Sequence, residues 1–337
     1  MVGLMTFFVL TGQTVATILG RFYYDQGGDS KWMATLVQSA GSLLFLLPLL
    51  LLSSSNSPNT SILYSLTSKA AIYILFGIVI ASDNLMYSYG LLFLPVSTYS
   101  LICATQLAFN AVFSYYINSE KLTAPILNSV VLLTFSAALL GLHAGSETSV
   151  HVSGEKYTLG FILTLAASAL FSLLLSLMQL TFEKFYKRVT FKVVLELQTY
   201  TNFIATCTSV VGLFASGEWR SLRREMEEFK KGTEAYVMTL VWTAISWQVA
   251  SVGLVGLVFV ASSLLANMIG TLALPLVPIF AVIFFHDRLD GVKVMAMMVA
   301  LWGFLSYIYQ QYLDDSKAKK FARAHTMEIS VVSSPSV

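Results

Sequence analysis

Long apolar runs separated by short polar connectors form the main pattern of the chain. A helix that crosses a membrane needs about 20 predominantly apolar residues, and ten stretches have roughly that length. They are 3–22, 33–52, 70–93, 96–117, 123–142, 158–182, 191–215, 236–258, 261–285 and 291–312. The pattern therefore predicts an all-α integral membrane protein with ten transmembrane helices.

The connectors between these runs differ in character. Residues 146–156 form a short polar linker, and residues 216–235 carry charges of both signs, which predicts an amphipathic surface helix. Residues 314–337 are basic and then rich in serine, so we expect a disordered tail. The junctions at 93–96 and 258–261 are so short that each neighbouring pair of spans is expected to form a helical hairpin.

An internal repeat relates the two halves of the chain. Phe113–Leu122 reads FSYYINSEKL, and Phe280–Leu289, about half the chain later, reads FAVIFFHDRL. Both end an apolar span with an acid, a base and leucine. Five spans per half is an odd number, so the halves, 1–145 and 157–313, must have opposite orientation in the membrane. Two inverted five-helix repeats are typical of secondary transporters, whose substrate site lies between the halves.

Composition and charge agree with a chain that lies in a lipid bilayer. Hydrophobic residues make up 56% of the 337 residues and charged residues only 11%, whereas soluble domains are about a quarter charged. The net charge of +2 is too small to indicate a nucleic-acid partner. Ten spans put both termini on one side, and half of the 20 Lys and Arg residues fall on each side. The positive-inside rule therefore leaves the orientation open.

The positions of the cations restrict the cargo. Every Lys and Arg lies in a predicted connector or within about one turn of a span end. A carrier of phosphates, nucleotide sugars or carboxylates needs a cation to pair with the buried anion, so we expect a neutral or weakly basic cargo. Cys103 and Cys207 have no clustered Cys or His ligands, so no metal site is predicted. No enzyme or nucleotide-binding motif occurs, so neither an enzyme nor a cofactor is indicated.

Asp83 is the acid nearest the middle of a predicted span. An ionised carboxylate is costly in hydrocarbon, so such a group is protonated, paired or in contact with water. It is a candidate for proton coupling or substrate binding, and the alternative is a structural acid that is hydrogen-bonded to a neighbouring helix. Glu196 is a second candidate for the coupling group, although an acid near a helix N-terminus is also favoured by the helix dipole.

Amide and aromatic side chains recur in the same spans. Amides can bind the donor and acceptor edge of a heterocycle, and aromatic rings can stack on its face. The alternative is that the amides hold helices together, as is common in membranes. The substrate-binding candidates are Asn84, Tyr87, Gln106, Phe109, Asn110, Gln198, Trp247 and Gln248; Asn202 and Asn267 are further polar positions inside spans.

Several stretches resemble the plant purine permease family, which belongs to the drug/metabolite transporter superfamily. These stretches are LGRFYYDQGGDSKW (19–32), SDNLMYSYGLLFLPVSTYSLICATQLAFN (82–110), EKL (120–122), SWQVASVGLVGLVFVASSLLA (246–266) and LWGFLSYIY (301–309). They are spread over nearly the whole chain. The resemblance implies a fold of two inverted five-helix repeats.

The resemblance also implies a function. It implies symport of adenine, cytokinins and related purines, driven by a proton gradient without a cofactor, and cytosolic termini in a plasma-membrane protein. Asp83 is then the expected proton-coupling residue. Two alternatives are a carrier of another small organic solute within the superfamily and a receptor or scaffold that transports nothing.

Overall fold

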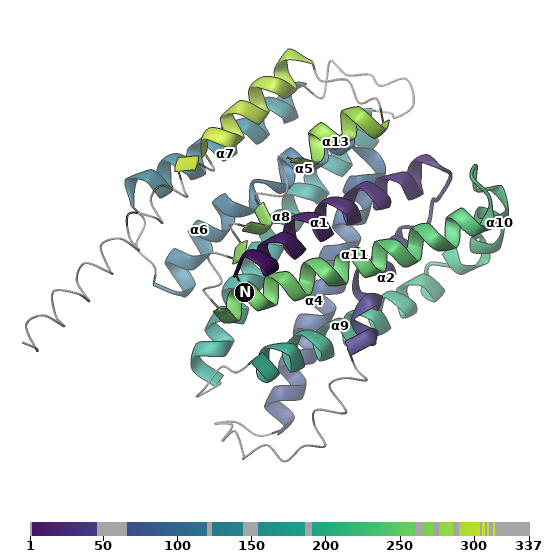
Figure 1. Ribbon diagram of the computed structural model, residues 1–337, viewed down its shortest axis with the longest axis horizontal. Coiled ribbons are helices and arrows are strands. Elements are labelled where there is room, and N and C mark those ends of the chain that lie inside the picture. The colour runs from purple at the N-terminus through teal and green to yellow at the C-terminus, as the bar shows by residue number, and fades with distance from the viewer. Residues whose placement is uncertain are drawn as a thin grey trace, which may run out of the picture.

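The computed structural model is helical throughout the part of the chain that it describes (Figure 1). That part comprises residues 2–45, 66–119, 123–143, 154–185, 191–260, 266–267, 269–271, 276–285, 290–303, 305–306, 309 and 313. The α-helices are α1 (Val2–Asp25), α2 (Lys31–Ala40), α4 (Leu66–Phe93), α5 (Val96–Cys103), α6 (Gln106–Ile117), α7 (Ala124–His143), α8 (Gly154–Phe185), α9 (Phe191–Ala215), α10 (Leu222–Glu228), α11 (Thr233–Val260) and α13 (Leu276–Phe285). Short 3₁₀ helices are η1 (Gly41–Phe45) and η2 (Glu218–Arg220), and Gly291–Gly303 is a further apolar helix.

Within the described residues, five helices are long and apolar enough to cross a membrane. They are Val2–Asp25, Ser68–Phe93, Val96–Ile117 (α5 and α6 counted as one span), Gly154–Phe182 and Thr233–Leu257. The expectation of an all-α chain with several membrane-length helices is thereby confirmed. The tight junction between the third and fourth predicted spans is also present, since α4 ends at Phe93 and α5 begins at Val96.

Some sequence-based expectations fall on residues outside the described part. These are most of the 146–156 linker, the charged ends of the two repeat segments, the 258–261 junction beyond Val260, and the 314–337 tail. The last three residues of the predicted linker, 154–156, belong to the first turn of α8.

A glycine turn joins α1 to α2. Gly27 has a φ of +112°, a conformation that glycine adopts without a steric penalty. The amide of Gly28 donates to the carbonyl of Tyr23 over 2.8 Å. Ser30 then caps α2, because its hydroxyl accepts from the amide of Met33 over 3.0 Å. The turn therefore has a defined shape, and it presents the backbone of Ser30 to neighbouring segments.

Arg21 connects α1 to the end of α4. Its Nη1 donates to the carbonyls of Leu91 and Leu94, over 2.9 and 2.8 Å, and its Nε lies 2.9 Å from Asp25. Carbonyls at a helix C-terminus lack helical partners and carry the negative end of the dipole. The Arg21 guanidinium therefore stabilises the α4 terminus.

The fourth predicted span is interrupted between α5 and α6, where the sequence pattern predicted one continuous helix. Thr105 donates twice to the carbonyl of Ile102: its amide over 3.0 Å and its hydroxyl over 2.7 Å. The spacing of three residues is that of a 3₁₀ turn, and a threonine hydroxyl that competes for a backbone carbonyl favours such irregularity. The break separates Cys103 from Gln106.

Helices from the two halves of the chain approach closely at glycines. A Cβ added to Gly12 on α1 would lie 2.6 Å from the amide nitrogen of Ala250 on α11, and one added to Gly253 would lie 2.7 Å from the carbonyl oxygen of Met5. Only glycine permits this backbone separation. Figure 1 shows α1 and α11 running side by side across the middle of the molecule.

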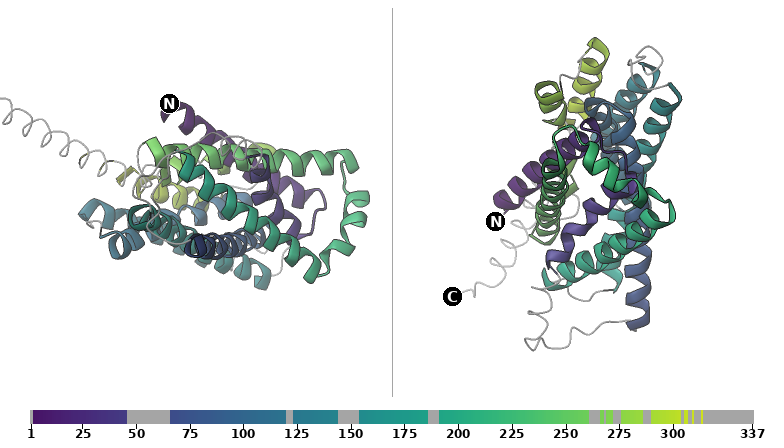
Figure 2. Two further views of the ribbon diagram at one scale, coloured as in Figure 1. Left: turned by 90° about the horizontal axis from the view of Figure 1, so that it is seen from below. Right: turned by 90° about the vertical axis from the view of Figure 1, so that its right-hand side faces the viewer.

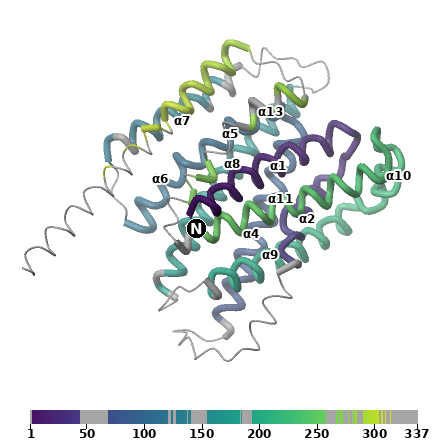
Figure 3. Tube along the Cα trace, in the orientation of Figure 1, coloured from purple at the N-terminus to yellow at the C-terminus, as the bar shows by residue number. Residues whose placement is uncertain are grey.

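Two further features define the arrangement. Helix α7 and the 291–303 helix run together along one edge (Figure 3), where the Ser136 hydroxyl donates to the Ala296 carbonyl over 2.8 Å. At one end of the bundle, α10 lies between the end of α9 and the start of α11, as both the first view and the view from below show (Figures 1 and 2).

Candidate functional site

A cavity of about 200 Å³ lies between helices of both halves. Its walls come from α1, α2, α4, α5 and α6 of the first half and from α8, α9 and α11 of the second, together with Asn267 and Gly270. Both sides of the α5–α6 break contribute, since Cys103 and Gln106 line it. Buried cavities of this kind, apolar with a few polar groups, are typical of small-molecule sites.

Six of the nine predicted site residues line this cavity. They are Asp83, Asn84, Tyr87, Gln106, Gln198 and Trp247. They come from α4, α6, α9 and α11 and are far apart in sequence. The fold thus brings most of the predicted polar and aromatic positions to one place.

Several of these side chains are already hydrogen-bonded to neighbouring helices. Gln106 Nε2 donates to Thr271 Oγ1 over 3.3 Å, and Gln198 Nε2 donates to the hydroxyl of Ser251. Tyr87 makes a long contact of 3.5 Å with Ser168. These contacts orient the polar groups, and they also agree with the alternative that amides hold helices together.

Asp83 and Asn267 differ from this set because each has an unpartnered polar atom. Asp83 is 3% exposed and Asn267 is 2% exposed, yet Asp83 Oδ1 and Asn267 Nδ2 make no hydrogen bond in the described part of the chain. A buried polar atom without a partner costs about 1–3 kcal/mol. An acceptor and a donor are therefore unused in the lining of the same cavity.

The cavity is aromatic and carries no cation. Tyr87 and Tyr99 pack edge to face, with ring centroids 6.0 Å apart, and Trp247 lies in the same lining. Asp83 is the carboxylic acid among the lining residues, and no Lys or Arg occurs among those that the structure describes. Such a lining suits a planar, uncharged molecule better than an anion.

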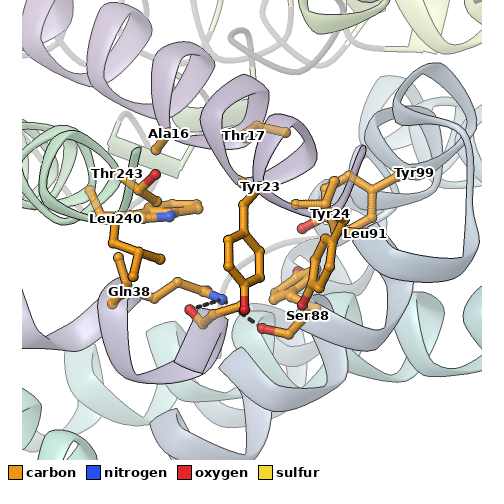
Figure 4. Close-up of a pocket in the computed structure, with 15 residues that line it drawn as sticks. Ala16, Thr17, Tyr23, Tyr24, Gln38, Ser88, Leu91, Tyr99, Leu240 and Thr243 are labelled. Atoms are coloured by element: carbon orange, nitrogen blue, oxygen red, sulfur yellow. Dashed lines mark hydrogen bonds between the residues drawn. The ribbon is translucent and has the colours of Figure 1, made fainter. Parts of the chain in front are cut away.

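A smaller cavity of about 30 Å³ adjoins the first one (Figure 4). The two share Thr17, Gln38, Tyr87, Tyr99 and Trp247. Figure 4 shows Tyr23 and Tyr24 on the α1 side of the small cavity, and Gln38 Nε2 donates to Ser88 Oγ over 3.0 Å. The shared residues form the partition between the two cavities.

Three predicted site residues lie elsewhere. Phe109 is half-buried and Asn110 is buried on α6, and neither lines the larger cavity. Gln248 is buried next to Gly41 of η1. A Cβ added to Gly41 would lie 3.1 Å from the Cβ of Gln248. Glu196, the second candidate for proton coupling, lies on α9 outside the lining.

The cavity also contains residues that were not among the predicted site. Asn202 and Asn267, which the sequence marks as polar positions inside spans, both line it. Gln13, Gln38 and Ser251 line it as well, and they were not among the predicted polar positions. A polar side chain inside an apolar run is the signal that could have identified Gln13 and Gln38.

Comparison with known proteins gives a consistent result. A family model described as purine nucleobase transmembrane transport matches residues 1–317. Probable purine permease 11 of Arabidopsis thaliana is 59% identical over 321 residues, which cover 95% of this chain and 85% of that protein. Purine permease 21 of Arabidopsis thaliana is 52% identical over 330 residues, covering 97% and 84%. A crystal structure with 14% sequence identity is similar in fold, with a TM-score of 0.55, over 90% of this chain and 98% of that one.

Proposed function

Because this chain belongs to the purine permease family, we propose that it is a proton-coupled symporter that carries purine nucleobases and derivatives such as cytokinins through the central cavity. The family consists of transporters rather than enzymes. The observation that carries the proposal is the lining of the cavity. It combines one acid with a free oxygen, several amides and four aromatic rings, and no cation among the described lining residues.

The roles follow from the chemistry of the groups. Asp83 takes up and releases the coupled proton, since its free Oδ1 faces no fixed partner. Asn84, Gln106, Gln198 and Asn267 supply donors and acceptors for the ring nitrogens and exocyclic groups of a purine. Tyr87 and Trp247 stack on its face.

The ten-helix inverted repeat is part of the same proposal, and the packing of the helices supports it. If the predicted spans are numbered one to ten, adding five relates α1 to α8, α2 to α9, α4 to α11 and α5–α6 to α13. Under this exchange the contact of α1 with α11 becomes that of α8 with α4. In the same way, α2 with α11 becomes α9 with α4, and α1 with α13 becomes α8 with α6. All of these contacts are present in the structure.

Alternating access follows from that arrangement, because two related halves around one cavity can expose it to either side in turn. We further propose that the protein resides in the plasma membrane with cytosolic termini. A protease-cleavable tag at each end, digested in intact and in permeabilised cells, tests the orientation.

Uptake of labelled adenine into proteoliposomes with an inward proton gradient tests the function. We expect unlabelled cytokinin to compete with labelled adenine for uptake, and we expect nucleoside phosphates not to compete. Trp247→Ala is expected to weaken the apparent affinity by up to about tenfold, the size of an aromatic contact. Trp242→Ala is the matched control, because Trp242 lies on the same helix but is 55% exposed. Unchanged affinity in Trp247→Ala would remove that residue from the site, and absence of purine uptake would refute the proposal.

A further inference from the structure

Glu225 is a buried acid at the end of the bundle. It lies on α10 in the charged segment, yet it is only 6% exposed. Its Oε1 accepts from the hydroxyl of Tyr23 and, over 3.1 Å, from the hydroxyl of Tyr236. Its Oε2 accepts from the amide of Ser30 over 3.2 Å. One carboxylate therefore holds α1, the α1–α2 turn and α11 together.

The neighbouring residues reinforce this attachment. Glu218 Oε2 accepts from the Ser30 hydroxyl over 2.7 Å and from the Trp32 amide over 3.1 Å. The Lys230 amide donates to the Gln26 carbonyl over 3.0 Å, and its ammonium group donates to the Asp25 carbonyl over 2.8 Å. The segment 218–230 is thus tied at several points to the α1–α2 turn.

The small cavity lies between this cluster and the central cavity. Tyr23, whose hydroxyl binds Glu225, lines the small cavity. On α11, Tyr236, Leu240, Thr243 and Trp247 are spaced by three or four residues and therefore share one face. Leu240, Thr243 and Trp247 line the small cavity, and Trp247 also lines the central one. At 1.5 Å per residue, Tyr236 and Trp247 lie roughly 16 Å apart along the helix. Glu225 thus lies at the outer end of a line of cavities.

The Glu225 contacts also cross the boundary between the halves. Tyr23 and Ser30 belong to the first half, whereas Glu225 and Tyr236 belong to the second. A change of access in an inverted-repeat transporter moves one half relative to the other. Opening at this end therefore requires the bonds that Tyr23 and Ser30 make to Glu225 to break, while Tyr236 helps to hold the carboxylate in place.

We propose that residues 218–230 form a latch that closes this end of the transport pathway, and that Glu225 is the acceptor on which the latch depends. That the latch opens and closes during transport rests on the proposed transport function. That the latch limits access of water-soluble reagents to the small cavity does not depend on transport and can be tested separately. Removing Glu225, or the hydroxyl donors that it binds, shifts the protein toward a form in which the small cavity is reachable from this end.

The test is the rate at which a cysteine in the small cavity reacts with a water-soluble maleimide. Ala34 lines that cavity, so Ala34→Cys supplies the reporter in full-length protein purified in detergent. Labelling is quantified on the peptide that contains position 34, which allows Cys103 and Cys207 to stay in place. Glu225→Ala and, as a milder change, Tyr23→Phe and Tyr236→Phe are then introduced. Glu227→Ala is the matched control, because Glu227 lies on the same helix with a side chain 59% exposed and paired only with Arg223 in the described residues.

We expect the labelling rate to rise by at least about tenfold in Glu225→Ala, because three hydrogen bonds are lost and one hydrogen bond to a charged group is already worth about that factor. We expect a smaller rise in each Tyr→Phe variant and no change in Glu227→Ala.

If Glu225→Ala does not yield a monodisperse protein, the labelling rates of the two Tyr→Phe variants decide whether the latch exists. Equal rates in those variants and the parent would overturn the latch, as would an equal rise in Glu227→Ala. Because labelling requires no purine, a rise in the absence of purine uptake would support the latch while refuting the transport function.

Discussion

Asp83 is the residue on which proton coupling depends in the proposed mechanism. It lies in the lining of the central cavity with one carboxyl oxygen free of partners in the described part of the chain. One proton moved with each substrate down a gradient of one pH unit supplies about 1.4 kcal/mol, enough for about tenfold accumulation. We expect Asp83→Asn to abolish this accumulation while purine still exchanges across the membrane, because asparagine keeps the size of the side chain but does not titrate.

The measurement is uptake against the imposed pH gradient, with and without an uncoupler. Glu196→Gln is the matched control, because Glu196 lies outside the cavity lining and was the alternative coupling group. If Asp83→Asn still accumulates purine in response to the gradient, its coupling role is wrong. Loss of coupling in Glu196→Gln alone would assign the role to α9.

At the scale of helices, close packing of α1 on α11 depends on glycine. A side chain at Gly12 would collide with the backbone of Ala250 and with the carbonyl of Ser246, at 2.6 and 2.7 Å. Backbone cannot move aside as a flexible side chain can, and overpacking typically costs about 1–3 kcal/mol. We expect Gly12→Val to lower the thermal unfolding midpoint in detergent by several degrees. Gly3→Val on the same helix is the control, since nothing lies within 4 Å of an added Cβ there. If Gly12→Val and Gly3→Val have the same unfolding midpoint, the close contact at Gly12 does not determine the stability of the protein.

The helices themselves could be predicted from sequence because membrane spans are set by the length of apolar runs. The break between α5 and α6 could not, since it depends on the Thr105 hydroxyl binding the Ile102 carbonyl. The rotation of each helix about its own axis could not be predicted from the sequence pattern either. Trp247 lines the cavity while its neighbour Gln248 packs beside Gly41. Which of two adjacent polar residues faces the cavity is decided by packing against neighbouring helices, about which periodicity alone says little.

Among the polar residues of the interior, too, some could be predicted from the sequence and others could not. A mid-span acid such as Asp83 stands out against apolar neighbours, so the sequence identified it. Gln13 and Gln38 became part of the site only when α1 and α2 were placed against α4 and α11. The burial of Glu225 was equally hidden, because its neighbours in sequence are charged and its three donors come from Tyr23, Ser30 and Tyr236.

At the scale of the whole molecule, the latch makes access depend on pH. Burial raises the pKa of Glu225 above its ordinary range, and the hydrogen bonds from Tyr23, Tyr236 and the Asp29–Ser30 backbone offset only part of that rise. In a form open at this end the carboxyl group faces water, and its pKa falls back toward the usual value of about 4.3. A proton then binds more tightly to the closed form. Lowering the pH through the interval between the two values therefore favours closure.

The expected result is that maleimide labelling at position 34, in the Ala34→Cys protein, falls relative to labelling of a second cysteine introduced at exposed Glu155, at the start of α8, as the pH is lowered toward 5. Taking the ratio removes the pH dependence of the thiol reaction itself.

The ionisable groups around Glu225 are Tyr23 and Tyr24 on α1, Asp29 and Lys31 at the α1–α2 turn, Glu218 on η2 and Tyr236 on α11. Glu225→Gln should make the ratio independent of pH, because glutamine cannot titrate. A ratio that still falls in Glu225→Gln would assign the pH response to a group other than Glu225, while a ratio that rises on acidification in the parent protein would reverse the predicted direction.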